Sequence, residues 1–165
     1  MKYIIRITFL TLVLFVSVSV QGQSHMDHDA EHHHYRNEIS VAAGVVPLTS
    51  EEKVTAGLHL HYVRGIGAES RFGVGTGLEL IFDEHRHYTI SVVFQYRLYK
   101  GLILGYAPGL LIRRENSVYS YQLAHHFEAA YEFELGQFHI GPMLEVGVEQ
   151  QGVHYMLGIH FGYDF

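Results

Sequence analysis

The chain ends with the stretch "HYMLGIHFGYDF", His154 to Phe165, in which every second residue is large and apolar. The apolar residues are Tyr155, Leu157, Ile159, Phe161, Tyr163 and Phe165, and the residues between them are His154, Met156, Gly158, His160, Gly162 and Asp164. Strict alternation predicts a β-strand with two different faces. One face is apolar, and the other carries histidine and glycine where an ordinary wet surface would carry lysine and glutamate.

The same period of two recurs along the chain from residue 37 onward. Eight runs show it: 37–47, 53–63, 72–82, 87–98, 102–112, 117–134, 137–148 and 154–165. The pieces between the runs are short and are polar or contain glycine, which predicts antiparallel hairpins between neighbouring strands. Beyond the first 22 residues, no helix of useful length is visible in the sequence.

The composition of the two faces predicts the environment of the sheet. The first face carries large apolar residues such as Leu78 and Phe94, whereas the second is small, polar and poor in charge. This pattern is typical of a membrane barrel with lipid outside and a narrow polar lumen inside. Since backbone groups in hydrocarbon must pair within the protein, the sheet has to close. The sequence therefore predicts an all-β fold, a closed eight-stranded antiparallel up-and-down transmembrane β-barrel, over residues 37–165.

Two segments precede the predicted barrel. Residues 1–22 have Lys2 and Arg6 followed by an apolar run and then small residues, which predicts a cleaved secretory signal peptide. A retained membrane anchor is the alternative, although the apolar run is shorter than the roughly 20 residues that a spanning helix needs. Residues 23–36 show no apolar period and are predicted to be a disordered, histidine-rich periplasmic tail.

Composition excludes some kinds of chemistry. After the signal peptide, nine lysine and arginine residues (eleven less Lys2 and Arg6) stand against 17 acidic residues, which gives a net charge of −8 with histidine neutral. An acidic chain without basic clusters argues against nucleic acid as a partner. The chain has no cysteine, so disulfides, thiolate metal sites and cysteine nucleophiles are absent.

The end of the chain resembles the carboxy-terminal signature of bacterial outer-membrane barrels. Phe165 is a terminal aromatic residue, Tyr163 is aromatic two places earlier, and Phe161 continues the apolar alternation upstream. In that family, the barrel-insertion machinery reads this signature. The resemblance implies a monomeric protein in contact with outer-membrane lipid, with both termini in the periplasm. Typical members have longer external loops, so the short loops here argue against adhesion or receptor roles.

The tail is a candidate metal-binding segment. Its five histidines are interleaved with acidic residues and comprise His25, His28, His32, His33 and His34. Imidazole and carboxylate together suit borderline divalent ions such as zinc, copper or nickel. The alternative is a solvated linker that binds metal only incidentally.

The predicted lumen carries a second set of candidate residues. The candidate metal ligands are His59, His61, His126, Glu128 and His160, and the surrounding polar network comprises Glu79, Arg97, His139, Glu145 and His154. Counting inward from the turns places His59, His126, Glu128 and His160 in the middle third of the barrel. Two readings stay open at this point. The groups form either a polar plug that satisfies itself by hydrogen bonding, or an interior metal or proton site.

These features predict a non-enzymatic outer-membrane protein that binds a divalent transition metal through its tail and lumen histidines. A purely structural barrel with a polar plug is the main alternative. A lipid A-modifying enzyme is a weaker one, because deacylases in this class of barrel use histidine, serine and an acid. Glu128 stands where such a pattern has its nucleophilic serine two residues after His126.

Overall fold

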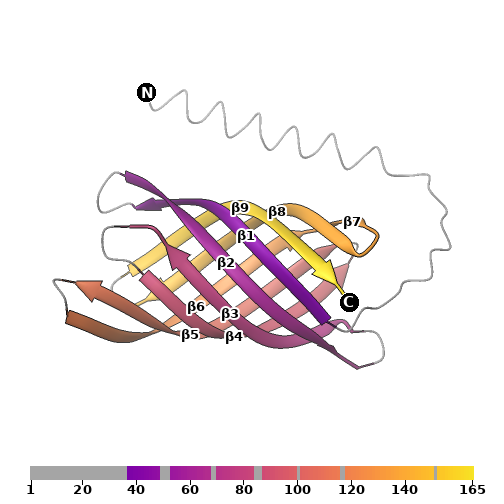
Figure 1. The fold of residues 1–165 in the computed structure, drawn as a ribbon, viewed down its shortest axis with the longest axis horizontal. Coiled ribbons are helices and arrows are strands. Elements are labelled where there is room, and N and C mark those ends of the chain that lie inside the picture. Colours follow the sequence, from indigo (N-terminus) through magenta and orange to yellow (C-terminus); the bar gives the residue numbers. More distant parts are fainter. Residues whose placement is uncertain are drawn as a thin grey trace. The chain divides into compact units, whose positions relative to one another are not determined.

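In the computed structural model of the protein, the described residues are 37–48, 53–67, 70–83, 87–99, 101–115, 118–150 and 152–165. They form a single antiparallel β-sheet (Figure 1). The predicted signal peptide and the histidine-rich tail lie outside these residues. Within the described ranges, no helix is long and apolar enough to cross a membrane.

The strands follow the predicted alternating runs closely. Their bounds are β1 (Asn37–Leu48), β2 (Lys53–Ile66), β3 (Phe72–Ile81), β4 (His87–Tyr99), β5 (Leu102–Glu115), β6 (Val118–Tyr131), β7 (Phe133–Leu135), β8 (Phe138–Glu149) and β9 (Gly152–Asp164). The period of two therefore located every strand to within a few residues, because one face is apolar throughout.

The sixth run is the one that departs from the prediction of an unbroken strand. It is interrupted at Glu132, whose backbone N–H donates to the Gly101 carbonyl at 2.8 Å. The register against β8 nevertheless continues across the break, from Ala130 opposite Met143 to Phe133 opposite Ile140. Hence β6 and β7 act as one strand of the barrel, and the described sheet has eight strands around its circumference.

The sheet closes on itself through β1 and β9. The Asn37 N–H donates to the Phe165 carbonyl at 3.1 Å, and the Phe165 N–H donates to the Asn37 carbonyl at 2.8 Å. We call the end that contains Asn37 and Phe165 the terminal end. The hairpins between β1 and β2, β3 and β4, β5 and β6, and β8 and β9 lie at the opposite, loop end.

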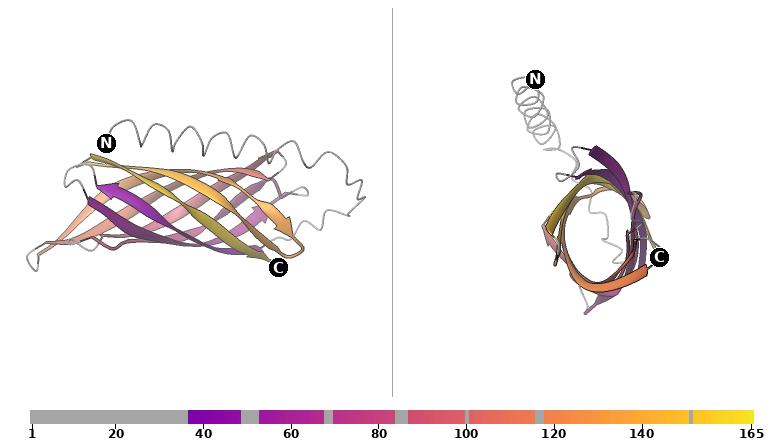
Figure 2. Two further views of the ribbon diagram at one scale, coloured as in Figure 1. Left: turned by 90° about the horizontal axis from the view of Figure 1, so that it is seen from above. Right: turned by 90° about the vertical axis from the view of Figure 1, so that its left-hand side faces the viewer.

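The strand registers fix the stagger of the barrel. Cross-strand partners can be followed once around the sheet, starting from Gly162 of β9. The successive partners are Ser40, His61, Gly77, Ser91, Gly109, Ala124, Glu149 and finally Gly152. The path returns to β9 ten residues from its start, at 152 instead of 162. A stagger of this kind tilts the strands by roughly 35–45° to the barrel axis, and the tilted strands enclose a single lumen (Figure 2).

The two faces of the sheet are distributed as the sequence predicts. Large apolar side chains such as Leu123 (66% exposed) and Ile159 (53% exposed) point outward. Small and polar side chains such as Ser40 and His59, each 3% exposed, point into the lumen. The fold class is therefore confirmed as a closed eight-stranded antiparallel barrel with an apolar outer surface and a polar interior.

A charge on the outer surface should destabilise the barrel in proportion to its depth in the bilayer. Ile159 lies midway along β9, opposite Ala43 of β1. Replacing it with arginine should lower the free energy of unfolding in lipid vesicles by about 2–4 kcal/mol. The control is Val54→Arg, which lies at the loop end of β2, is 67% exposed and should cost at most about 1 kcal/mol. Equal costs at both sites, measured by urea unfolding, would contradict a lipid-facing outer surface.

Candidate metal centre in the barrel lumen

The lumen contains far more acidic than basic groups. The inward-facing carboxylates include Glu38, Glu79, Asp83, Glu128, Glu132, Glu145, Glu149 and Asp164, the arginines include Arg71, Arg97 and Arg113, and the histidines include His59, His61, His87, His126, His139, His154 and His160. The named carboxylates outnumber the named arginines, which leaves a negative charge when the histidines are neutral. Because a buried charge must be compensated, protons on the histidines or bound cations have to supply the balance.

Four of these side chains converge near the terminal end. The Nε2 atoms of His139 and His160 are 3.1 Å apart. Glu132 Oε1 lies 3.2 Å from the first of these atoms and 3.3 Å from the second. Glu38 Oε1 lies 3.8 Å from each. We call Glu38, Glu132, His139 and His160 the terminal-end cluster. All four residues are buried, with at most 4% of their surface exposed.

Residues outside the terminal-end cluster contact the atoms of its side chains that face away from the cluster centre. Arg97 donates from Nη1 to Glu132 Oε2 at 2.8 Å and from Nη2 to Glu38 Oε2 at 2.7 Å. His139 places its Nδ1 atom 3.3 Å from Asp164 Oδ2. A carboxylate at Nδ1 orients an imidazole so that its Nε2 lone pair is available to a cation. One oxygen of each glutamate is therefore committed to Arg97, while the other faces the two Nε2 atoms.

The converging oxygens lack hydrogen bonds. Glu38 Oε1 and Glu132 Oε1 are buried, and neither accepts a hydrogen bond of acceptable geometry from any described residue. Leaving a buried carboxylate oxygen unsatisfied is costly. Both oxygens point to the same place as two imidazole nitrogens, which is the arrangement that a cation would satisfy.

The spacing of the four atoms fits a small divalent cation. Zinc binds nitrogen and oxygen at about 2.0–2.2 Å, which places tetrahedral ligand atoms roughly 3.4 Å apart. The observed separations of 3.1, 3.2, 3.3 and 3.8 Å bracket that value. The terminal-end cluster therefore has the donor types, the burial and the spacing of a two-histidine, two-carboxylate metal centre.

A glycine makes room for one of the ligands. His139 of β8 pairs with Gly162 of β9, and a Cβ atom at position 162 would collide with the imidazole ring of His139. Gly162 thus leaves the space into which the His139 imidazole folds. Gly158 lies instead against the backbone of β1, where a Cβ atom would collide with the Ala43 carbonyl oxygen.

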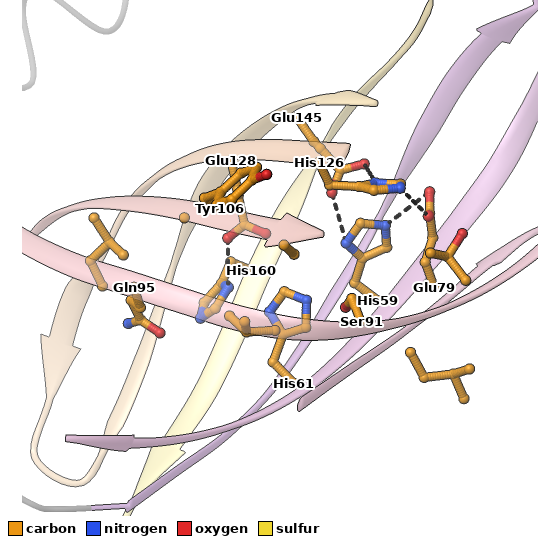
Figure 3. Close-up of a pocket in the computed structure, with 16 residues that line it drawn as sticks. His59, His61, Glu79, Ser91, Gln95, Tyr106, His126, Glu128, Glu145 and His160 are labelled. Carbon is orange, nitrogen blue, oxygen red and sulfur yellow. Dashed lines mark hydrogen bonds and ion pairs between the residues drawn. The ribbon is translucent and has the colours of Figure 1, made fainter. Parts of the chain in front are cut away.

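A second group lies nearer the loop end and has a different geometry. His59 contacts Glu79 through Nε2 at 3.3 Å and Glu145 through Nδ1 at 2.9 Å. His126 contacts the same two carboxylates, each at 3.2 Å. The four side chains form a closed ring in which histidine and glutamate alternate (Figure 3). We call His59, Glu79, His126 and Glu145 the loop-end ring.

The loop-end ring is able to balance its own charge. An imidazole that faces a carboxylate at both nitrogens requires an N–H at each, and is then a cation. Two such histidines neutralise two glutamates without any other ion. His154 adds a contact to Glu79 at 3.3 Å and one to Glu149 at 3.1 Å, and Arg113 bonds to Glu149 at 2.8 Å.

The structure divides the lumen residues differently from the sequence analysis. His59 and His126 lie together in the loop-end ring with Glu79 and Glu145. His61 and Glu128 lie between the two groups. His160 belongs to the terminal-end cluster with His139, and Arg97 bonds to the glutamates of that cluster. The predicted insertion-signal residues Phe161, Tyr163 and Phe165 point outward, with 42%, 36% and 45% of their surfaces exposed.

Sequence analysis missed Glu38 and Glu132 as site residues. Both follow from the period of two, since Glu38 shares a face with Ser40, and Glu132 shares one with Glu128. Each lies next to the end of its alternating run, where the face is harder to assign. The alternation was therefore a sufficient signal for both residues.

Arg97 is predicted to be required for the stability of the terminal-end cluster in the absence of metal. Arg97→Gln should lower the free energy of unfolding at neutral pH by about 3 kcal/mol, because Glu38 and Glu132 lose their shared cation. Arg97→Lys should lie between this variant and the parent protein, since an ammonium group cannot bridge two carboxylates as a guanidinium does. The exposed Arg64 provides the control, and Arg64→Gln should cost at most about 0.5 kcal/mol. Similar urea midpoints for Arg97→Gln and Arg64→Gln would refute this role.

Comparison with known proteins identifies the fold. No family model matches the chain, and no curated protein sequence matches it. Among solved structures, Neisserial surface protein A has a TM-score of 0.58 at 6% identity, covering 79% of this chain and 97% of that one. The Yersinia pestis outer membrane protein Ail in a phospholipid bilayer nanodisc has a TM-score of 0.53 at 14% identity, covering 78% and 99%. The N-terminal β-barrel domain of Pseudomonas aeruginosa OprF has a TM-score of 0.52 at 13% identity, covering 79% and 99%. At these identities the likeness concerns the fold, which is that of small outer-membrane β-barrels.

Proposed function

We propose that this protein is a non-enzymatic outer-membrane β-barrel that holds a divalent transition metal ion in its lumen. The observation that carries the proposal is the convergence of two imidazole nitrogens and two unsatisfied carboxylate oxygens in the terminal-end cluster. The opposite sides of these groups are already bound by Arg97 and Asp164. Because the atoms that face away from the cluster centre are bonded to Arg97 and Asp164, the remaining ligand atoms are pre-oriented for a cation.

The location follows from the outer surface. Apolar side chains cover the outside of the closed sheet, and contiguous exposed apolar surface of this extent needs a lipid or protein cover. The fold likeness to outer-membrane barrels supports lipid as that cover. We further propose that both termini lie in the periplasm, that the barrel is a monomer, and that Phe161, Tyr163 and Phe165 are read by the barrel-insertion machinery.

The donor set favours zinc, copper or nickel over magnesium or calcium. Imidazole nitrogen suits the borderline transition metals, whereas magnesium and calcium prefer oxygen ligands alone. The carboxylates of Glu38, Glu132 and Asp164 carry three negative charges and Arg97 carries one positive charge, which leaves two negative charges when both histidines are neutral. A divalent ion therefore neutralises the cluster without protonating either histidine.

The histidine-rich tail remains a sequence-based part of the proposal. His25, His28, His32, His33 and His34 precede the barrel, and the tail ends one residue before Asn37. Asn37 in turn is adjacent to Glu38, a member of the terminal-end cluster. We propose that the tail histidines bind the same metals more weakly and raise their concentration near that end of the barrel.

A purely structural barrel is the second candidate function. The loop-end ring favours it, because each histidine there lies between two glutamates and two protonated histidines would neutralise both. The terminal-end cluster distinguishes the two candidates, since two imidazole nitrogens there face each other at 3.1 Å beside the two carboxylates.

Zinc titration tests the metal centre. The barrel with all five tail histidines replaced by alanine should bind one zinc ion at neutral pH with a dissociation constant of about 1 μM or tighter. His139→Gln in that background should abolish this binding. His125→Gln should leave it unchanged, because His125 is exposed on the outer face of β6, where its Nδ1 atom bonds to the Tyr106 hydroxyl. Calorimetry gives the affinity, and elemental analysis of the purified protein gives the metal content.

Two results would overturn the metal proposal. One is the absence of zinc binding in the folded tail-histidine variant. The other is zinc binding that survives both His139→Gln and His160→Gln. Either result would leave the structural barrel as the better account, with the lumen groups compensated by protons alone.

Lipid analysis tests the non-enzymatic part of the proposal. Overproducing the protein should leave the mass spectrum of lipid A unchanged, because Glu128 occupies the position of the serine nucleophile in a deacylase-like pattern. Glu128 also faces the lumen, away from the lipid. Loss of an acyl chain from lipid A on overproduction would contradict this assignment.

A further inference from the structure

Metal-binding groups extend from the loop-end ring to the terminal-end cluster without a long gap. Glu145 belongs to the ring and pairs across the strands with Glu128. Glu128, His59 and His61 offer ligand atoms that all lie within 4.8 Å of one another. Glu128 Oε1 is also 3.9 Å from Nδ1 of His160 in the terminal-end cluster. Glu128 therefore lies between the two groups, and a turn of the His160 ring would bring the Nε2 atom that faces the terminal-end cluster toward it.

A cavity lies at the same place. It has a volume of about 20 Å³ and is lined by members of both groups, including His59 and Glu145 on one side and His160 on another (Figure 3). His61 and Glu128 line it as well. A space of this size holds about one water molecule, and a dehydrated divalent ion is no larger. The cavity is therefore a chamber between two sets of metal ligands.

Small side chains line part of the cavity. Ser91 of β4 and Gly105 and Ala107 of β5 are among its lining residues. Gly105 pairs across the strands with Glu128, and Ala107 pairs with His126, so both lie beside donors. A side chain at Gly105 would press on the Cβ atom of Glu128, and the small residues therefore leave the donors of β6 room to move.

Both ends of the series approach solvent. At the loop end, His154 and Glu149 have 12% and 8% of their side chains exposed. At the terminal end, Asp164 is 21% exposed and Arg97 is 34% exposed. Arg71 and Arg97 lie near the terminal end, and Arg113 lies near the loop end. The acidic stretch between them favours cations over anions.

We propose that the lumen is a transit path for a divalent transition metal ion. The ion passes between the loop-end ring and the terminal-end cluster by ligand exchange, with Glu128 and His61 as the transfer ligands. The inference rests on the proposed function, because the terminal-end cluster is the site at which the ion is held. The transit path adds movement of the ion through the barrel to the binding of the ion in the terminal-end cluster.

Zinc influx into vesicles tests the path. The full mature protein is reconstituted into phosphatidylcholine vesicles that contain a zinc-sensitive dye, and zinc chloride is added outside. The parent barrel should admit zinc faster than protein-free vesicles do. Glu128→Gln combined with His61→Asn should slow influx by roughly tenfold, the scale expected when groups around a metal are removed. His125→Asn, on the outer face of β6, is the matched control and should conduct as the parent does.

A second variant closes the chamber without removing a ligand. Ala107→Leu fills the cavity beside its cross-strand partner His126 and should also slow influx, while zinc binding at the terminal-end cluster, measured by calorimetry, persists. Heat-dependent gel mobility verifies that each variant forms a folded barrel. This variant keeps the test decisive if the doubly substituted lumen does not fold.

The outcomes separate the two proposals. Zinc binding without influx above the protein-free rate overturns the transit path and leaves the metal centre intact. Influx that is unaffected by both Glu128→Gln/His61→Asn and Ala107→Leu also overturns the path. Absence of zinc binding overturns the proposed function, and the transit path falls with it.

Discussion

The hydrogen bonds between β1 and β9 close the sheet, and the remaining features of the lumen depend on that closure. A closed sheet has an inside that bulk water does not fill, so the carboxylates that face inward must find their counter-charges within the barrel. The same closure leaves no unpaired strand edge toward the lipid. Closure of the backbone thus requires the inward-facing carboxylates to be neutralised inside the barrel, and the histidines and arginines supply the positive charge.

The two lumen groups meet this requirement by different geometries. In the loop-end ring, each imidazole lies between two carboxylates and uses both nitrogens. In the terminal-end cluster, two imidazoles turn the same nitrogen toward a common point, and Arg97 draws the outer oxygens of Glu38 and Glu132 away from it. The first geometry suits protons shared between pairs, and the second suits one ion shared among four ligands. The difference arises from where the arginine lies, since Arg113 bonds to Glu149 and does not contact the ring directly.

Sequence alone predicted the strands and the direction of most side chains, because alternation specifies a face wherever one side is apolar. It did not predict which lumen residues meet. Counting inward from the turns placed His160 at the same depth as His59 and His126, whereas the structure joins it to His139 and Glu132. The reason is the stagger of ten residues around the barrel, which depends on every strand register at once. No single alternating run of the sequence specifies this stagger, because the stagger is the sum of all the strand registers.

The glycines of β8 and β9 show how backbone and site chemistry are linked. Gly162 pairs with His139 and Gly147 pairs with His154, and in both cases the imidazole occupies the space that a glycine side chain leaves empty. In a narrow lumen, large polar groups fit only where their partners across the strands are small. The alternation of histidine with glycine is therefore a packing rule as well as a chemical one. It allows the inward-facing imidazoles and carboxylates to lie within contact distance of one another in one narrow lumen.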